Sequence, residues 1–103
     1  MKVLALAFLA LRASFAAEVI VDDANFSQVV TESNKPWVIE FYSEMCGSCK
    51  EFAPTWHSFA EKLETVDGLG TGRVCVDKQP GVNLASSLDG LFDAGIPQVR
   101  ACV

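Results

Sequence analysis

Residues 37–56 have the sequence WVIEFYSEMCGSCKEFAPTW, in which an apolar strand pattern changes directly into a helix pattern. The run from Trp37 to Tyr42 is aromatic and β-branched and does not alternate apolar with polar residues. Such a run is typical of a central strand that is buried on both faces. From Cys46 to about Val66, apolar side chains recur on one helical face, at Phe52, Trp56, Phe59 and Leu63. This segment therefore predicts a buried strand followed by a long helix.

The segments around this unit predict further strands and helices in alternating order. They are a strand over 18–21, a helix over 22–34, a turn over 68–72, a strand over 73–77, a short helix over 81–88 and an extended tail from 95. Strands that alternate with helices indicate an α/β fold with a mostly parallel sheet and right-handed crossovers. Pro54 lies inside the long helix and should kink it.

Composition limits the class of protein. Half of the 103 residues are apolar and the formal charge is −5, which indicates a globular chain with no Lys/Arg cluster for nucleic acid. Residues 1–16 combine Lys2, a nine-residue apolar run and small residues before Ala17, the pattern of a secretory signal peptide. The alternative, a membrane anchor, needs about 20 apolar residues. Cleavage of the signal peptide removes Lys2 and Arg12, so the formal charge changes from −5 to −7. The remaining residues, 17–103, are predicted to form a single domain, and we expect no membrane anchor on it.

Cys46 and Cys49 stand three residues apart at the predicted start of the long helix. Unpaired backbone N–H groups and the helix dipole favour a thiolate there, and Cys49 lies one turn further along. A structural disulfide would close too small a loop to stabilise the fold much. A zinc site would need a second ligand pair, and His57, Cys75 and Cys102 have the wrong spacing. The context favours a redox-active dithiol, in an exported chain where disulfides persist.

Glu40 is a carboxylate within the predicted buried strand. If it is buried, desolvation raises its pKa, which suits a group that accepts and returns the proton of Cys49. If it faces solvent at the end of the strand, it needs no such role. The spacing leaves both readings open.

The segment from Trp37 to Trp56 resembles the active-site region of protein disulfide isomerase-type thioredoxin domains, which combine Glu-Phe-Tyr, the dithiol, Lys and Ala-Pro-x-Trp. The resemblance spans about 18–99 and implies a thioredoxin-like fold. It implies that Cys46 is the nucleophile, Cys49 the resolving thiol and Glu40 a buried proton relay. It also implies that Lys50 is a cation that favours the thiolate.

Gly95-Ile96-Pro97 resembles the loop with the family's cis-proline, so the resemblance implies that Ile96 and Pro97 bind an extended substrate chain. The family pattern continues beyond this loop with a hairpin and a closing helix, so we expect the C-terminal part of the fold to be incomplete. By family topology, Cys75 and Cys102 should not pair. Cys75 lies in an apolar strand pattern, where a free cysteine is expected to be a small core residue.

The sequence departs from the family pattern next to the dithiol. Glu44-Met45 replaces Pro-Trp, and Ser48 replaces the His of strongly oxidising members. Both changes should favour a higher Cys46 pKa and a more reducing couple than a typical isomerase has. Gln98 stands where Thr is usual.

These observations predict an enzyme for thiol–disulfide exchange on cysteine-containing client proteins, with a separate redox partner and no metal or organic cofactor. The expected location is the endoplasmic reticulum lumen, with secretion as the alternative. The competing hypothesis is a non-enzymatic, chaperone-like module that binds clients, or an inactive fragment.

Overall fold

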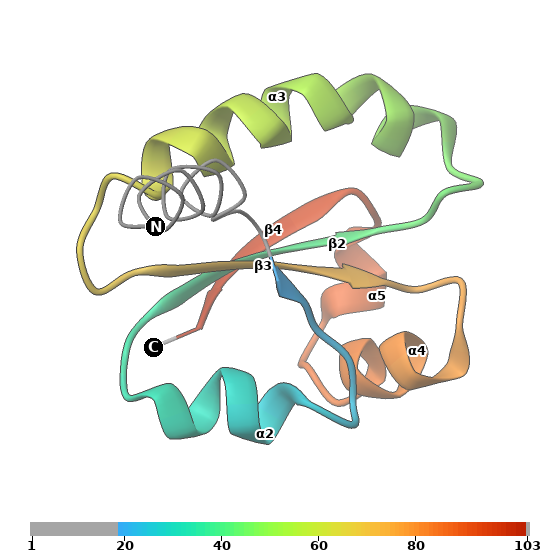
Figure 1. The fold of residues 1–103 in the computed structure, drawn as a ribbon. Helices are drawn as coiled ribbons and strands as arrows, with labels where there is room; N and C mark the ends of the chain where they lie inside the picture. Colours follow the sequence, from blue (N-terminus) through green and yellow to red (C-terminus); the bar gives the residue numbers. More distant parts are fainter. Residues whose placement is uncertain (1–18, 103) are drawn as a thin grey trace, which may run out of the picture.

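A four-stranded sheet forms the centre of the computed structural model, which describes residues 19–102 (Figure 1). The predicted signal peptide over 1–16 lies outside the described residues. The strands are β1 (Val19–Ile20), β2 (Trp37–Tyr42), β3 (Gly70–Cys75) and β4 (Gln98–Cys102). Their order is β1-β3-β2-β4, with β1, β2 and β3 parallel and β4 antiparallel to β2. The prediction of a mostly parallel α/β sheet is confirmed.

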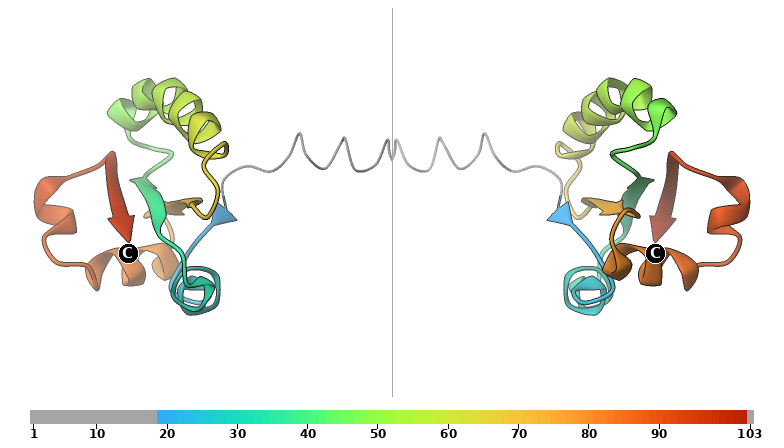
Figure 2. Two further views of the ribbon diagram at one scale, coloured as in Figure 1. Left: turned by 90° about the vertical axis from the view of Figure 1, so that its left-hand side faces the viewer. Right: turned by 90° about the vertical axis from the view of Figure 1, so that its right-hand side faces the viewer.

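Helices cover the sheet on both faces. They are α2 (Phe26–Val29), the 3₁₀ turn η1 (Thr31–Ser33), α3 (Gly47–Leu63), α4 (Gln79–Ser86) and α5 (Leu91–Ala94). In Figure 1, α3 lies above the sheet, while α2 and α4 lie below it. Figure 2 shows the same layers from the sides, with α3 apart from α2 and α4. Among residues 19–102, no helix combines the length and apolarity required to cross a membrane.

Strand β2 is the central strand that its sequence predicts, with pairing on both edges. Five of its six residues are buried. Side chains alternate along a strand, so Trp37, Ile39 and Phe41 share one face. They belong to the hydrophobic core between the sheet and the layer of α2 and α4. Glu40 therefore lies on the opposite face, the one that α3 covers.

Strand β3 begins three residues before its predicted start, because two glycines serve packing rather than a turn. A side chain on Gly70 would overlap the Trp37 indole. A Cβ on Gly72 would lie 3.1 Å from the Val19 carbonyl oxygen in the neighbouring strand. The predicted turn over 68–72 was therefore wrong for its second half, since the glycines allow close approach within the sheet.

The helices differ from the predictions at several points. The single helix predicted over 22–34 is instead the short α2 followed by the turn η1. Helix α3 ends at Leu63 rather than near Val66, and Phe59, predicted to face the core, is 44% exposed. Phe59 lies at the margin of the buried face, with its ring centroid 6.1 Å from that of Trp56. Helix α4 begins two residues early because Pro80 fits its first turn, where no N–H partner is needed. The short helix α5 was not predicted at all.

The chain after α5 is held by the Gln98 side chain. Its amide donates to the carbonyl oxygens of Leu91 and Gly95, each at 2.9 Å. The Ile96–Pro97 peptide, which lies between Gly95 and Gln98, is cis. The predicted extended tail is strand β4, which runs antiparallel to β2.

Candidate active site

The two thiols meet just beyond the carboxyl end of β2, as the strand-to-helix pattern predicts. Cys46 is the N-cap of α3, and its sulfur accepts a hydrogen bond from the Cys49 backbone N–H at 3.1 Å. Cys46 is partly exposed, while Cys49 is buried in the first turn of the helix. An N-cap acceptor stabilises an otherwise unpaired helix N–H group, so one bond serves both the fold and the thiol.

The environment separates the two thiols electrostatically. Hydrogen bonding to Cys49 and then to Ser48 lowers the pKa of Cys46 below its ordinary value. Burial is the main cause that raises the pKa of Cys49, and the nearby Cys46 and Glu40 charges act in the same direction. A more acidic, accessible thiol therefore lies beside a less acidic, buried one.

Ser48, which replaces the histidine of strongly oxidising members, has an effect on Cys46 that the sequence did not reveal. Its hydroxyl lies 3.3 Å from the Cys46 sulfur and contributes to lowering the pKa of Cys46. Ser48 thus lacks the positive charge of a histidine but keeps a polar partner for the sulfur. The expectation that this position only disfavours the thiolate was incomplete.

Glu40 is 1% exposed, which agrees with the buried reading of its position and not with the solvent-facing one. The Arg73 Nε donates to Glu40 Oε1 at 3.0 Å. The two residues are register partners in the parallel pair of β2 and β3. A buried carboxylate with a cationic partner is far less costly than an isolated one.

Arg73 is a site residue that the sequence analysis missed. Its guanidinium lies 3.9 Å from the centroid of the Tyr42 ring, so it contacts both Tyr42 and Glu40. Arg73, Tyr42 and Cys49 line a pocket of about 190 Å³ between the sheet and the start of α3. A basic residue in an otherwise apolar strand pattern was the available signal, because such a residue needs a partner when it is half-buried.

Asp77 and Ser43 are two further residues at the site. Asp77 follows β3, and its carboxylate accepts hydrogen bonds from the Ser43 hydroxyl and, at 2.8 Å, from the Glu44 N–H. The bond from Ser43 and then the bond from Glu44 hold the pKa of Asp77 below its ordinary value. The Cys75 thiol also donates to Asp77, at 3.5 Å. Cys75 is half-buried beside this loop, so its prediction as a core residue was wrong.

The remaining predicted site residues lie at the same edge of the sheet. Lys50 is exposed in the first turn of α3 and lines the pocket that contains Cys49. Pro97 immediately precedes Gln98, the register partner of Phe41, and thus lies beside the carboxyl end of β2. Ile96 is half-buried and packs against the core. The roles that the resemblance gives these three residues stay predictions.

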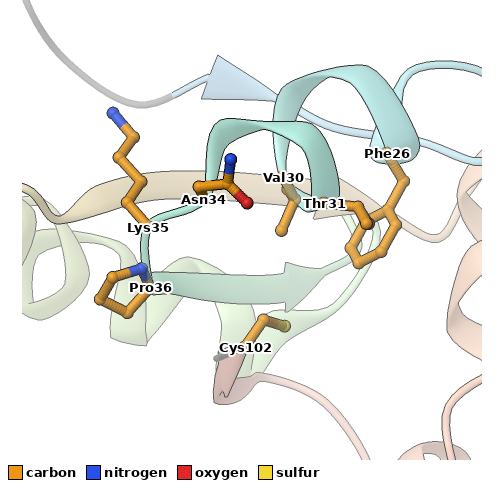
Figure 3. A pocket seen from close by; sticks show the side chains of 7 residues that line it. All are labelled: Phe26, Val30, Thr31, Asn34, Lys35, Pro36 and Cys102. Carbon is orange, nitrogen blue, oxygen red and sulfur yellow. The ribbon is translucent and has the colours of Figure 1, made fainter.

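A second pocket, of about 480 Å³, lies at the opposite end of the sheet (Figure 3). Phe26, Val30 and Cys102 line it from α2, its C-cap and β4. Cys102 is the register partner of Trp37, at the start of β2, whereas the dithiol follows the end of β2. Burial raises the pKa of Cys102, so this thiol has neither the position nor the acidity of Cys46.

The described residues contain no group of three or more His, Cys, Asp or Glu side chains placed to hold a metal ion. The chemistry available at the edge of the sheet is that of the two thiols, the buried carboxylate and the cations near them.

Comparison with known proteins gives the family context. The sequence matches the thioredoxin family over residues 17–91. Protein disulfide-isomerase like 2-2 of Arabidopsis thaliana is 41% identical over 54 residues, which cover 52% of this chain and 12% of the relative. Protein disulfide-isomerase A6 of Mesocricetus auratus is 33% identical over 78 residues, which cover 75% of this chain and 16% of the relative.

Solved structures agree with this match. The first thioredoxin domain of mouse protein disulfide-isomerase A4 superposes with a TM-score of 0.60 and 28% identity, covering 80% of this chain and 55% of that domain chain. The Trx4 domain of ERdj5 has a TM-score of 0.64, covers 82% of this chain and 68% of its own, and at 22% identity shows the fold alone. This chain spans 12% and 16% of the two curated relatives described above. The family match, the sheet order and the adjacent thiols lead to one conclusion: this chain belongs to the thioredoxin family, and its relatives include protein disulfide isomerases.

Proposed function

We propose that this chain catalyses thiol–disulfide exchange on protein substrates through Cys46 and Cys49. The observation that carries the proposal is the contrast between the thiols: Cys46 is an accessible helix N-cap with a lowered pKa, and Cys49 is a buried thiol with a raised pKa. The attacking species in thiol–disulfide exchange is the thiolate, so the accessible and more acidic thiol suits the attack.

The proposed reaction has two steps. The Cys46 thiolate attacks one sulfur of a client disulfide, which forms a mixed disulfide and releases the other client sulfur as a thiolate. Cys49 then loses its proton and attacks the Cys46 sulfur, which forms the Cys46–Cys49 disulfide and releases the second client sulfur. The client gains two electrons and the dithiol loses two. A dithiol reductant or a partner protein returns the two electrons for the next cycle.

Glu40 is proposed as the group that assists proton loss from Cys49. Burial holds the proton on Cys49, and the Glu40 charge is close enough to raise the pKa of this thiol further. A carboxylate on the same face of the sheet is suited to accept that proton before the second step and to return it afterwards. Arg73 fixes Glu40 Oε1 by its hydrogen bond at 3.0 Å.

Client binding is proposed at the loop that contains Ile96 and Pro97, which leads into β4 beside the carboxyl end of β2, with Lys50 as a cation near the thiolate. We further propose that the clients are cysteine-containing proteins of the secretory pathway, encountered in the endoplasmic reticulum lumen. The names of the relatives and the signal-peptide pattern support this location. Microscopy of the full-length chain with a small internal tag tests it, and a cytosolic distribution would contradict it.

The test of activity is the reduction of insulin disulfides by dithiothreitol in the presence of the full chain. We expect acceleration by the native sequence, and none by Cys46→Ser. Cys102→Ser is the matched control, because it removes a half-buried thiol at the end of β2 opposite to the dithiol. The competing function, client binding without exchange, predicts equal suppression of insulin aggregation by the native chain and by Cys46→Ser, with no acceleration by either.

A further inference from the structure

The turn that precedes the dithiol is held from a neighbouring loop. Asp77 Oδ1 accepts from the Ser43 hydroxyl, and Asp77 Oδ2 accepts from the Glu44 N–H at 2.8 Å. The Ser43 oxygen in turn accepts from the Met45 N–H at 3.1 Å. One carboxylate and one hydroxyl therefore satisfy two successive backbone N–H groups immediately before Cys46.

The loop with Asp77 has a fixed position relative to this turn. Strand β3 pairs with β2 through the Tyr42–Cys75 register pair, and the Val76 N–H donates to the Tyr42 carbonyl oxygen at 2.9 Å. Asp77 is the next residue, so the pairing at the end of β2 and β3 positions the Asp77 carboxylate beside Ser43. Hydrogen bonds to an ionised carboxylate are stronger than those between neutral groups.

Ser43 contacts both thiol residues through its backbone. The Cys46 N–H donates to the Ser43 carbonyl oxygen at 3.3 Å. A hydrogen bond from the Ser43 backbone also acts on Cys49, where it lowers the pKa against the larger effect of burial. The Ser43 backbone thus contacts the Cys46 N–H and the Cys49 thiol, while the Ser43 side chain is bound to Asp77.

We propose that Asp77 and Ser43 form a clamp that holds the turn over 43–46 in the geometry that favours the Cys46 thiolate and the reduced dithiol. Both are positioning residues: they act through the turn and not on the client. The effect of this clamp on the redox cycle rests on the proposed exchange function. The ionisation of Cys46, however, is measurable whether or not the chain turns over a substrate.

Ser43→Ala is the decisive variant, because it removes the hydroxyl and keeps the Asp77 charge. We expect the Cys46 thiolate to become less favourable by about three- to tenfold, the range for one hydrogen bond. The readout is the pH dependence of Cys46 alkylation by iodoacetamide in the reduced full chain, resolved from Cys49 by fragment-ion mass spectrometry. The glutathione equilibrium should shift toward the Cys46–Cys49 disulfide by a similar factor. Ser43→Thr keeps the hydroxyl and should restore the native profile.

A double-mutant cycle tests whether the effect passes through Asp77. We expect Ser43→Ala to change the profile of the native chain and to leave that of Asp77→Ala unchanged. Asp67→Asn, in the loop at the opposite end of the sheet, is the exposed carboxylate control and should match the native chain. An equal effect of Ser43→Ala in both backgrounds would overturn the clamp, as would an unchanged profile with only a lower melting temperature. Absence of insulin reduction by the native chain would instead contradict the proposed function.

Discussion

At the scale of single residues, the start of α3 gives its two cysteine side chains different burial and different pKa values. Cys46 lies before the first turn, where its sulfur accepts a hydrogen bond from the Cys49 N–H, whereas the Cys49 side chain is buried. The stabilising bonds to Cys46 act on its charged form, and burial of Cys49 disfavours its charged form. The difference in pKa between the two thiols therefore follows from their positions along α3.

The first prediction concerns the order in which the thiols react. Because the pKa of Cys46 is lowered, its thiolate persists to lower pH, and its alkylation should fall off only as the pH drops through that lowered value. Cys49 and Cys102 have raised pKa values and should react only at higher pH. Brief iodoacetamide treatment of the reduced chain between pH 5 and 9, with site-resolved mass spectrometry, measures this. Faster labelling of Cys49 or Cys102 than of Cys46 would contradict it.

The second prediction concerns the buried carboxylate. Glu40→Gln keeps the shape of the side chain and an acceptor for Arg73 but cannot accept a proton. We expect the release of client from the mixed disulfide to slow by at least about tenfold at pH 7, within the range for general acid–base groups. The rate should approach the native one at high pH, where Cys49 ionises unaided.

Rapid-quench measurement of the mixed disulfide from pH 6 to 10 checks the Glu40 prediction. Glu61→Gln, at an exposed position of α3, is the matched control. A variant that is slower by a constant factor at every pH would show that Glu40 acts through the fold and not as a proton acceptor.

At the scale of elements, close contacts between backbones determine where strands and helices meet. Gly81 in α4 lies against the end of β3, and a Cβ at this position would overlap the Cys75 carbonyl oxygen. The helix can approach the strand only because this side chain is absent.

The third prediction follows from that approach. Gly81→Ala should lower the free energy of unfolding by about 1–3 kcal/mol, the usual cost of overpacking. Gly47→Ala is the matched control: a Cβ there meets nothing within 4 Å, and Ala in place of a helical Gly should be neutral or stabilising by up to about 1 kcal/mol. Urea unfolding of the reduced chain gives both values. Equal stabilities of the two variants would contradict the packing argument.

The fourth prediction is that Cys75 and Cys102 do not form a disulfide with each other. They lie on strands that flank β2 on opposite edges, paired with Tyr42 and Trp37 at its two ends. Two strand spacings and five residues of rise separate them by roughly 19 Å, far beyond the about 7 Å limit for a bridge. Non-reducing proteolysis with mass spectrometry should show both as free thiols, and a peptide that joins them would refute the strand order.

These elements also show what the sequence could and could not predict. Strand β2 and the start of α3 were predictable, because a doubly buried strand and an amphipathic helix have distinct periodicities. The early start of β3 was not, since Gly70 and Gly72 gain their meaning only from Trp37 and Val19 on neighbouring strands. Likewise, the partners of Glu40 and Ser43, Arg73 and Asp77, come from a different strand and its following loop. Register and the spatial neighbours of polar side chains are tertiary information that a single sequence does not contain.

At the scale of the whole molecule, the two faces of the sheet are packed unequally. The core between the sheet and the layer of α2 and α4 contains nine buried residues: Val21, Val30, Trp37, Ile39, Phe41, Val74, Leu84, Ala85 and Leu91. On the other face, the buried residues are Cys49, Trp56 and Ala60 of α3 and, from the strands, Glu40, Tyr42 and Thr71, so fewer of them are apolar. The buried Trp56 Nε1 also lacks a hydrogen-bond partner in the described part of the chain. The layer that carries the dithiol is therefore the less firmly anchored one.

The fifth prediction is that α3 opens locally before the sheet does. Local opening costs less where fewer apolar contacts must be broken, so the reduced full chain should exchange the amides of the α3 segment over 56–63 at least about tenfold faster than those of β2. Hydrogen-exchange mass spectrometry at neutral pH measures both segments in one experiment. Ala60→Gly removes a buried methyl group from the helix and should accelerate exchange in α3 while leaving β2 unchanged. Leu84→Ala, in the opposite layer, should accelerate exchange in both segments, because loss of the main core lowers the stability of the whole domain. Equal protection of α3 and β2 in the native chain, with both rising together in Ala60→Gly, would show instead that the two layers unfold as one cooperative unit.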